Sequence, residues 1–85
     1  MKEQVIDLIG NKLDKLGIWI DEVYADKENK TDFLRIALDS NKMLTIEDVA
    51  MATRIISPLL DKGEFFENSY MLDIYAKEKG DDISE

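Results

Sequence analysis

The sequence predicts a single α+β domain, a two-layer sandwich in which two helices cover one face of a three-stranded sheet. Three observations point to this fold class. The elements follow the order helix, strand, strand, helix, strand. The helical segments carry one apolar stripe each, and the strand segments alternate apolar and polar residues. A chain of 85 residues suffices for one modest core. We expect the domain over residues 1–76 and a charged, disordered tail over 77–85.

The first element is an amphipathic helix, expected over residues 2–16. Charged and amide side chains occupy one side of this segment. Its apolar residues recur at helical spacing: Val5, Leu8, Ile9, Leu13 and Leu16. Gly17 stands where a left-handed C-terminal cap belongs.

A strand follows in "IWIDEVYA", residues 18–25, which is rich in β-branched and aromatic side chains. Its apolar phase changes at Asp21 and Glu22, and a β-bulge near that pair would put both halves on the core face. The next stretch, "DKENKT", is interpreted as a hairpin loop that is longer than the two-residue ideal and lacks glycine.

The second strand, "DFLRIALD", alternates cleanly. Leu34, Ile36 and Leu38 share one face, and Phe33, Arg35 and Ala37 share the other. The last strand is "YMLDIYA", residues 70–76. One of its phases is formed by Tyr70, Leu72, Ile74 and Ala76, and the other by Met71, Asp73 and Tyr75.

Between these strands lies a second helix. Thr45 is the expected N-cap, and Glu47 and Asp48 in the first turn favour the helix dipole. Pro58 removes a backbone donor, so we expect a kink there, or a stop near Ser57 followed by one more turn. The expected buried stripe is Val49, Ala52, Ile56 and Leu59. After Gly63, the expected end of the helix, Phe65 and Phe66 are expected to tuck against the core.

Charge and composition exclude several classes of function. The net charge is −8 and the cations are spread among acids, so direct nucleic-acid binding is not expected. An acidic surface attracts a basic partner, although solubility alone explains it equally well. The sequence has no histidine, no cysteine and no glycine-rich phosphate loop. We therefore expect no enzyme, no metal and no cofactor.

We expect no secretory signal, since the first residues include two acids and no uninterrupted apolar core, and no apolar run in the sequence is long enough to span a membrane. A cytoplasmic protein is expected. The element order is close to that of a type II KH domain, but the GxxG loop that clamps RNA in that fold is missing.

One group of residues is a candidate contact surface. If both helices cover one face of the sheet, large side chains remain on the other face, where they are available to a partner unless loops, the tail or a neighbouring chain cover them. The candidates are Trp19, Phe33, Arg35, Met71 and Tyr75.

The segments "LGIWIDEVYADKENKTDFLRIALDS", "LTIEDVAMATRIISPLLD" and "YMLDI" together resemble the N-terminal domain of the RimP family, bacterial maturation factors of the small ribosomal subunit. The positions that match in order and spacing are Leu16 and Gly17, Ile20 and Val23, Asp39, Thr45 to Asp48, Thr53 and Arg54, and Tyr70 to Ile74. Family members continue the last strand into Ser-Ser-Pro-Gly-Leu-Asp-Arg-Pro and a second, barrel-like domain. Here "YAKEKGDDISE" stands in that place, so we expect a divergent, stand-alone or shortened relative.

The resemblance implies a non-enzymatic assembly factor that binds the immature small ribosomal subunit, in part through a basic ribosomal protein. The alternative is a stand-alone structural module that forms a homodimer through the open sheet face or an exposed strand edge, without any ribosome.

Overall fold

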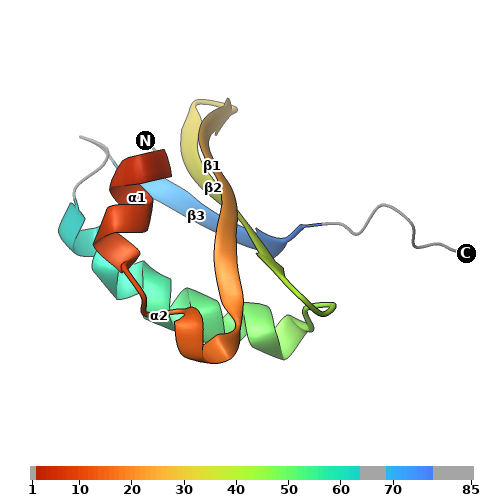
Figure 1. Cartoon of the computed structure of the whole chain (residues 1–85). Coiled ribbons are helices and arrows are strands. Elements are labelled where there is room, and N and C mark those ends of the chain that lie inside the picture. Colours follow the sequence, from red (N-terminus) through yellow and green to blue (C-terminus); the bar gives the residue numbers. More distant parts are fainter. Residues whose placement is uncertain (1, 64–68, 78–85) are drawn as a thin grey trace, which may run out of the picture.

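The fold is a mixed three-stranded sheet with two helices on one side (Figure 1). The computed structural model describes residues 2–63 and 69–77. In chain order the elements are helix α1 (Lys2–Ile9), the 3-10 turn η1 (Asp14–Leu16), strands β1 (Ile18–Glu28) and β2 (Thr31–Ser40), helix α2 (Ile46–Gly63) and strand β3 (Tyr70–Ala76). The predicted α+β class and element order are confirmed. Residues 65, 66 and 78–85, to which predictions applied, lie outside the described part.

The strand order is β1-β2-β3, with β1 antiparallel and β3 parallel to the central strand β2. The pairing shifts between Ile20 and Glu22, which confirms the predicted β-bulge. Because of this bulge, Ile18 and Val23 are both buried although they lie an odd number of residues apart. The strand therefore keeps one apolar face along its length.

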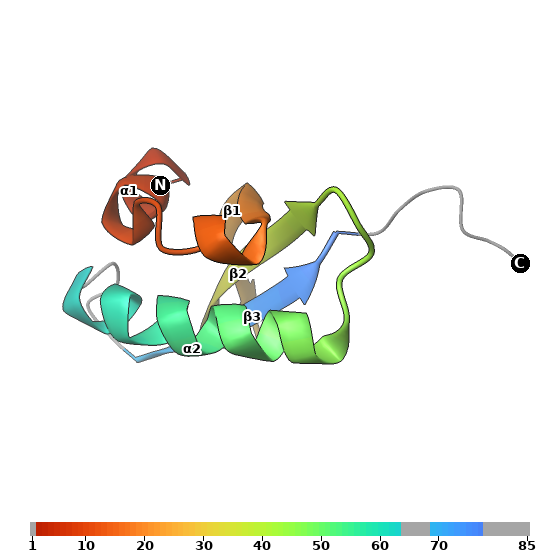
Figure 2. The same ribbon diagram turned by 60° about the horizontal axis from the view of Figure 1, so that its bottom comes forward.

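The core lies between the sheet and the helices (Figure 2). Leu34, Ile36 and Leu38 of β2 are fully buried, as the alternation predicted. They belong to one cluster with side chains from both helices: Val5 and Ile9 of α1, and Ala52, Ile56 and Leu60 of α2. Tyr70, Leu72 and Ile74 of β3 pack against this cluster. Both helices thus cover the same sheet face.

The first helix is shorter than predicted. It ends at Ile9, because Gly10 takes a left-handed conformation with φ of 61° and turns the chain. Leu13 is nevertheless buried, since the turn and η1 return it to the core. Gly17 has φ of 72° and donates its N–H to the Asp14 carbonyl oxygen, so the predicted left-handed cap is confirmed at the end of η1.

The hairpin is tighter than predicted. Strand pairing continues to Glu28 and Thr31, and only Asn29 and Lys30 form the turn. Both have positive φ, 50° and 68°, which is the backbone of a two-residue hairpin whose twist matches that of the strands. The expectation of a longer loop was wrong because pairing of the flanking strands supports a left-handed conformation even without glycine.

Helix α2 begins with the predicted cap. The Asp48 N–H donates to Thr45 Oγ1 at 3.1 Å, and the Thr45 N–H donates to Asp48 Oδ2 at 2.9 Å. This reciprocal pair satisfies two backbone donors at the helix start and lowers the pKa of Asp48. The helix does not stop near Ser57 but continues through Pro58 to Gly63. Leu60 is fully buried where Leu59 was expected, and Leu59 is half-buried.

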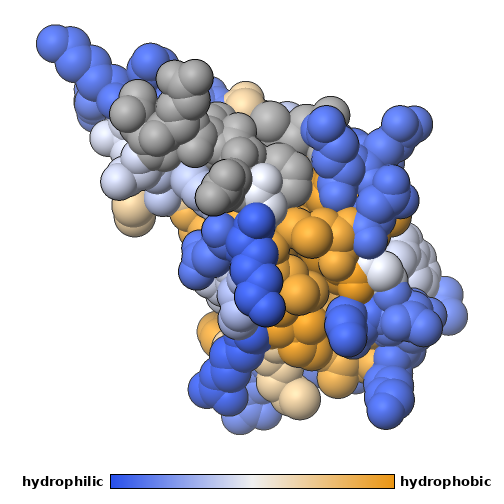
Figure 3. All heavy atoms as spheres, turned by 90° about the vertical axis from the view of Figure 1, so that its left-hand side faces the viewer, coloured by the Kyte–Doolittle hydropathy of each residue, from blue (hydrophilic) through white to orange (hydrophobic). Residues whose placement is uncertain are grey.

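The helical layer leaves part of the apolar surface uncovered. Figure 3 shows hydrophobic side chains gathered between hydrophilic ones on the side where α1 and the C-terminal end of α2 lie. A core shared by so few elements cannot enclose every apolar side chain.

Candidate functional site

The candidate site is the sheet face turned away from the helices, named here the outer sheet face. Strand register arranges its side chains in three cross-strand rows. The rows, read from β1 through β2 to β3, are Asp26–Phe33–Met71, Tyr24–Arg35–Asp73 and Glu22–Ala37–Tyr75. Trp19 stands opposite Asp39 at the end of this face, beyond the bulge.

Arg35 is the centre of this face. Its Nη1 lies 2.5 Å from Asp73 Oδ2, its Nη2 lies 2.8 Å from Glu28 Oε2, and its Nε lies 3.1 Å from Asp26 Oδ2. Its guanidinium carbon also lies 4.5 Å from the centroid of the Phe33 ring, a cation–π contact. The hydrogen bond that Arg35 donates to the Asp73 carboxylate is the largest cause of a raised pKa for Arg35. One cation is therefore shared by three carboxylates from β1 and β3.

A pair of tyrosines joins the two edge strands. The hydroxyl oxygens of Tyr24 on β1 and Tyr75 on β3 lie 3.0 Å apart and share a hydrogen bond across β2. This bond is the largest cause, followed by burial and nearby negative charge, that raises the pKa of Tyr75 to about 12, because each of them favours the neutral phenol over the phenolate.

The family model of the RimP N-terminal domain matches residues 8–76. The chain belongs to the RimP N-terminal domain family. The match runs from α1 to the last residue of β3, so it includes the whole sheet and all of α2. This RimP N-terminal domain is thus a module of the ribosome maturation factor type, and the resemblance drawn from the ordered segments is confirmed.

All five candidate residues of this RimP N-terminal domain lie on the outer sheet face, but they differ in accessibility. Trp19 and Met71 are exposed, with 46% and 55% of their surface accessible. Phe33, Arg35 and Tyr75 are half-buried. The guanidinium of Arg35 contacts three carboxylates, so it fixes the positions of the acidic side chains on this face. Their role in binding a partner stays a prediction.

Sequence reasoning missed the residues that surround these candidates: Tyr24, Asp26, Glu28 and Asp73. The signal for all four was present, because the alternation over residues 70–76 already groups Asp73 with Met71 and Tyr75. Once the bulge at Asp21 is accepted, the alternation that buries Val23 puts Tyr24, Asp26 and Glu28 on the opposite face. Their contacts with Arg35 and Tyr75, however, depend on the strand register.

Within residues 2–63 and 69–77, no group of three or more histidine, cysteine, aspartate or glutamate side chains is placed to hold a metal ion. Neither helix in that part of the chain is long and apolar enough to cross a membrane.

Proposed function

We propose that this RimP N-terminal domain is a non-enzymatic, cytoplasmic binding module that contacts a basic ribosomal protein or an assembly intermediate of the small subunit. The contact is made by the outer sheet face. The observation that carries this proposal is the surplus of carboxylates around Arg35, since one guanidinium cannot neutralise three of them.

These carboxylates remain accessible to a partner. The exposed fractions of the side chains are 39% for Asp73, 44% for Asp26 and 60% for Glu28. Glu22, on the same face, is exposed as well. Arg35 holds the first three in place, so a cation of the partner meets oxygens that are already oriented. Preorganised, complementary charge favours fast association and selects for basic surfaces.

Apolar side chains flank the acidic centre. Met71 lies on β3, and Trp19 lies on β1 near the bulge. A protein interface typically combines such an apolar and aromatic contact with polar groups. The mixture favours a basic protein over bare RNA, because the net charge of −8 repels a phosphate backbone.

Co-sedimentation with small ribosomal subunits, mature and immature, over a salt series tests the proposal. We expect binding to immature subunits that weakens as salt rises. Glu22→Lys on the outer sheet face should weaken it several-fold more than Asp7→Lys on α1, although both variants change the charge equally. Equal weakening of binding by the two variants, or no co-sedimentation of the protein with subunits at low salt, would count against the proposal.

A second candidate function is self-association. It is supported by the position of Trp19 and Met71 on β1 and β3, which are the two edge strands of the sheet. In that case two copies pair through the outer sheet face or through a strand edge. Light scattering over a range of concentrations separates the two candidates, because a stable dimer without subunit binding favours the second.

A further inference from the structure

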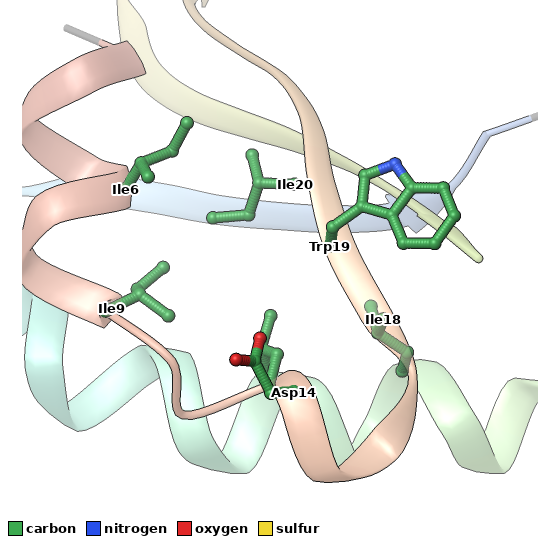
Figure 4. Close-up of a pocket in the computed structure, with 8 residues that line it drawn as sticks. Ile6, Ile9, Asp14, Ile18, Trp19 and Ile20 are labelled. Atoms are coloured by element: carbon green, nitrogen blue, oxygen red, sulfur yellow. The ribbon is translucent and has the colours of Figure 1, made fainter.

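A separate pocket lies on the helical side of β1, between the end of α1 and the first residues of the strand (Figure 4). Its volume is about 240 Å³. Five aliphatic side chains line it: Ile6, Ile9, Leu13, Ile18 and Ile20. Three of these, Ile9, Leu13 and Ile18, are almost fully buried and form a fixed floor, whereas Ile6 is 37% exposed at the edge. Helix α1 ends at Ile9, and the pocket lies where the chain passes from this helix through a turn and η1 into β1.

One acidic group shares this apolar pocket. Asp14, the first residue of η1, lines it, and its carboxylate points toward the space between Ile9 and Ile18 (Figure 4). Among residues 2–63 and 69–77, no side chain or backbone group forms an ion pair or hydrogen bond with this carboxylate. The pocket therefore combines an apolar floor with an uncompensated negative charge.

Size and charge together define the group that fits. Small-molecule sites usually enclose about 300–1,000 Å³, so this pocket is on the scale of a side chain. Lysine and arginine have an apolar stem and a cationic head. Such a stem can cover the isoleucines while its head meets Asp14, and the net charge of −8 attracts cations in general.

We infer that this pocket binds the side chain of a lysine or arginine residue of a basic protein partner. The inference rests on the proposed function, because it names the group of that partner which this chain recognises. Trp19 connects the two surfaces. It borders the pocket from β1, and Figure 4 shows its ring pointing away from Ile20 and α1, toward the other side of the strand. One segment of the partner can therefore cross the edge of β1 and touch both.

Chemical-shift titrations of the full chain with three probes test the inference. Pentylammonium has both the stem and the charge of lysine, pentanol has only the stem, and ammonium has only the charge. We expect pentylammonium to shift the methyl signals of Ile6 and Ile20 and the indole signal of Trp19, the only tryptophan. Pentanol should shift the same signals with weaker affinity, and ammonium should leave them unchanged.

Two variants with the same change of charge locate the binding. Asp14→Asn should weaken pentylammonium binding about three- to fivefold at low salt and leave pentanol binding unchanged. Asp7→Asn, on α1 outside the pocket, should have no such effect. Equal weakening by both variants, or pentylammonium shifts spread over all acidic residues, would overturn the inference.

The outcome is distinguishable from failure of the proposed function. If the protein co-sediments with subunits but pentylammonium does not enter the pocket, only the pocket assignment is wrong. If pentylammonium binds in an Asp14-dependent way but the protein does not co-sediment with subunits, the pocket recognises cations and the assignment of a ribosomal partner is wrong. In that second case, a chemical-shift change on self-dilution would identify another copy of the chain as the source of the cation.

Discussion

At the scale of single residues, Arg35 is the cation that holds three carboxylates together on the outer sheet face. Asp26, Glu28 and Asp73 all contact its guanidinium, so their mutual repulsion is offset at one point. Exposed ion pairs are usually weak one by one, but several charges in one network with an arginine have defined geometry. Its contact with Phe33 also holds the guanidinium against the sheet.

Replacing Arg35 by glutamine should lower the melting temperature, because three carboxylates then face one another without a cation. The deficit should shrink in high salt, since salt screens their repulsion. Arg54→Gln is the matched control: it removes the same charge from an exposed position on α2. Thermal melts of both variants at low and high salt measure the effect. Identical melting of the two would show that the network does not stabilise the fold.

Tyr75 makes stability depend on pH in the alkaline range. Its pKa is about 12 in the folded chain against an ordinary value of 10.0, so folding favours the protonated phenol. The stabilisation is fully present below pH 10 and is lost as the pH rises through about 12. Tyr24→Phe removes the hydrogen-bond partner and should return the titration of Tyr75 toward its ordinary value. Phenolate absorbance against pH, with Tyr75→Phe to assign the step, is the measurement; an unchanged curve in Tyr24→Phe would contradict it.

At the scale of elements, the start of α2 shows how side-chain hydrogen bonds determine where a helix begins. Thr45 and Asp48 exchange hydrogen bonds at its start. Thr45→Ala should reduce the free energy of unfolding by about 1 kcal/mol, because it removes the side-chain acceptor of the cap. Thr45→Ser keeps that acceptor and should stay close to the parent. Urea unfolding of both variants checks this, and a serine variant as unstable as the alanine one would exclude capping as the cause.

Pro58 lies inside α2, where the helix is stable in spite of it. Its ring occupies an exposed position and removes the hydrogen bond to the Arg54 carbonyl. Pro58→Ala should therefore raise the free energy of unfolding by about 1–3 kcal/mol. Pro58→Gly should gain about 1 kcal/mol less, since glycine is a poor helix former. If alanine gives no gain in urea unfolding, the turn around Pro58 is maintained by packing alone.

Elements were predictable from the sequence, and their ends were less so. The change of apolar phase at Asp21 predicted the bulge, because only a bulge keeps Ile18 and Val23 on one face. The end of α1 at Ile9, just before Gly10, was not predicted, since Leu13 and Leu16 continue the helical spacing and reach the core through η1 instead. The hairpin turn at Asn29 and Lys30 was missed because tertiary pairing overrides the local preference against positive φ.

At the scale of the whole molecule, the two-layer arrangement determines what remains available to a partner. Both helices pack on the Leu34 side of the sheet, so neither of them covers the other side. Alternation along each strand predicted which candidate residues share that side. It could not predict that Arg35 contacts three carboxylates or that Tyr24 meets Tyr75, because these contacts join segments up to 51 residues apart through the register of three strands.

A double substitution of Trp19 and Met71 distinguishes a contact surface from a structural one. Trp19 and Met71 are about half exposed and lie on the two edge strands, so Trp19→Ser with Met71→Ser should lower the free energy of unfolding much less than a substitution in the fully buried core. Binding to immature subunits should nevertheless fall, because both side chains supply apolar contact area. Met71 is a sharper choice than Tyr75, whose loss would also break the hydrogen bond to Tyr24.

Circular dichroism, urea unfolding and co-sedimentation of the same double variant give the answer. Ile36→Ser, at a fully buried position, is the control for a true core defect and should unfold the domain in part or in full. If the double variant behaves like Ile36→Ser, the two side chains stabilise the fold and the outer sheet face is not a binding surface. If the double variant folds and co-sediments with subunits like the parent, the carboxylates bind the partner without a contribution from Trp19 and Met71.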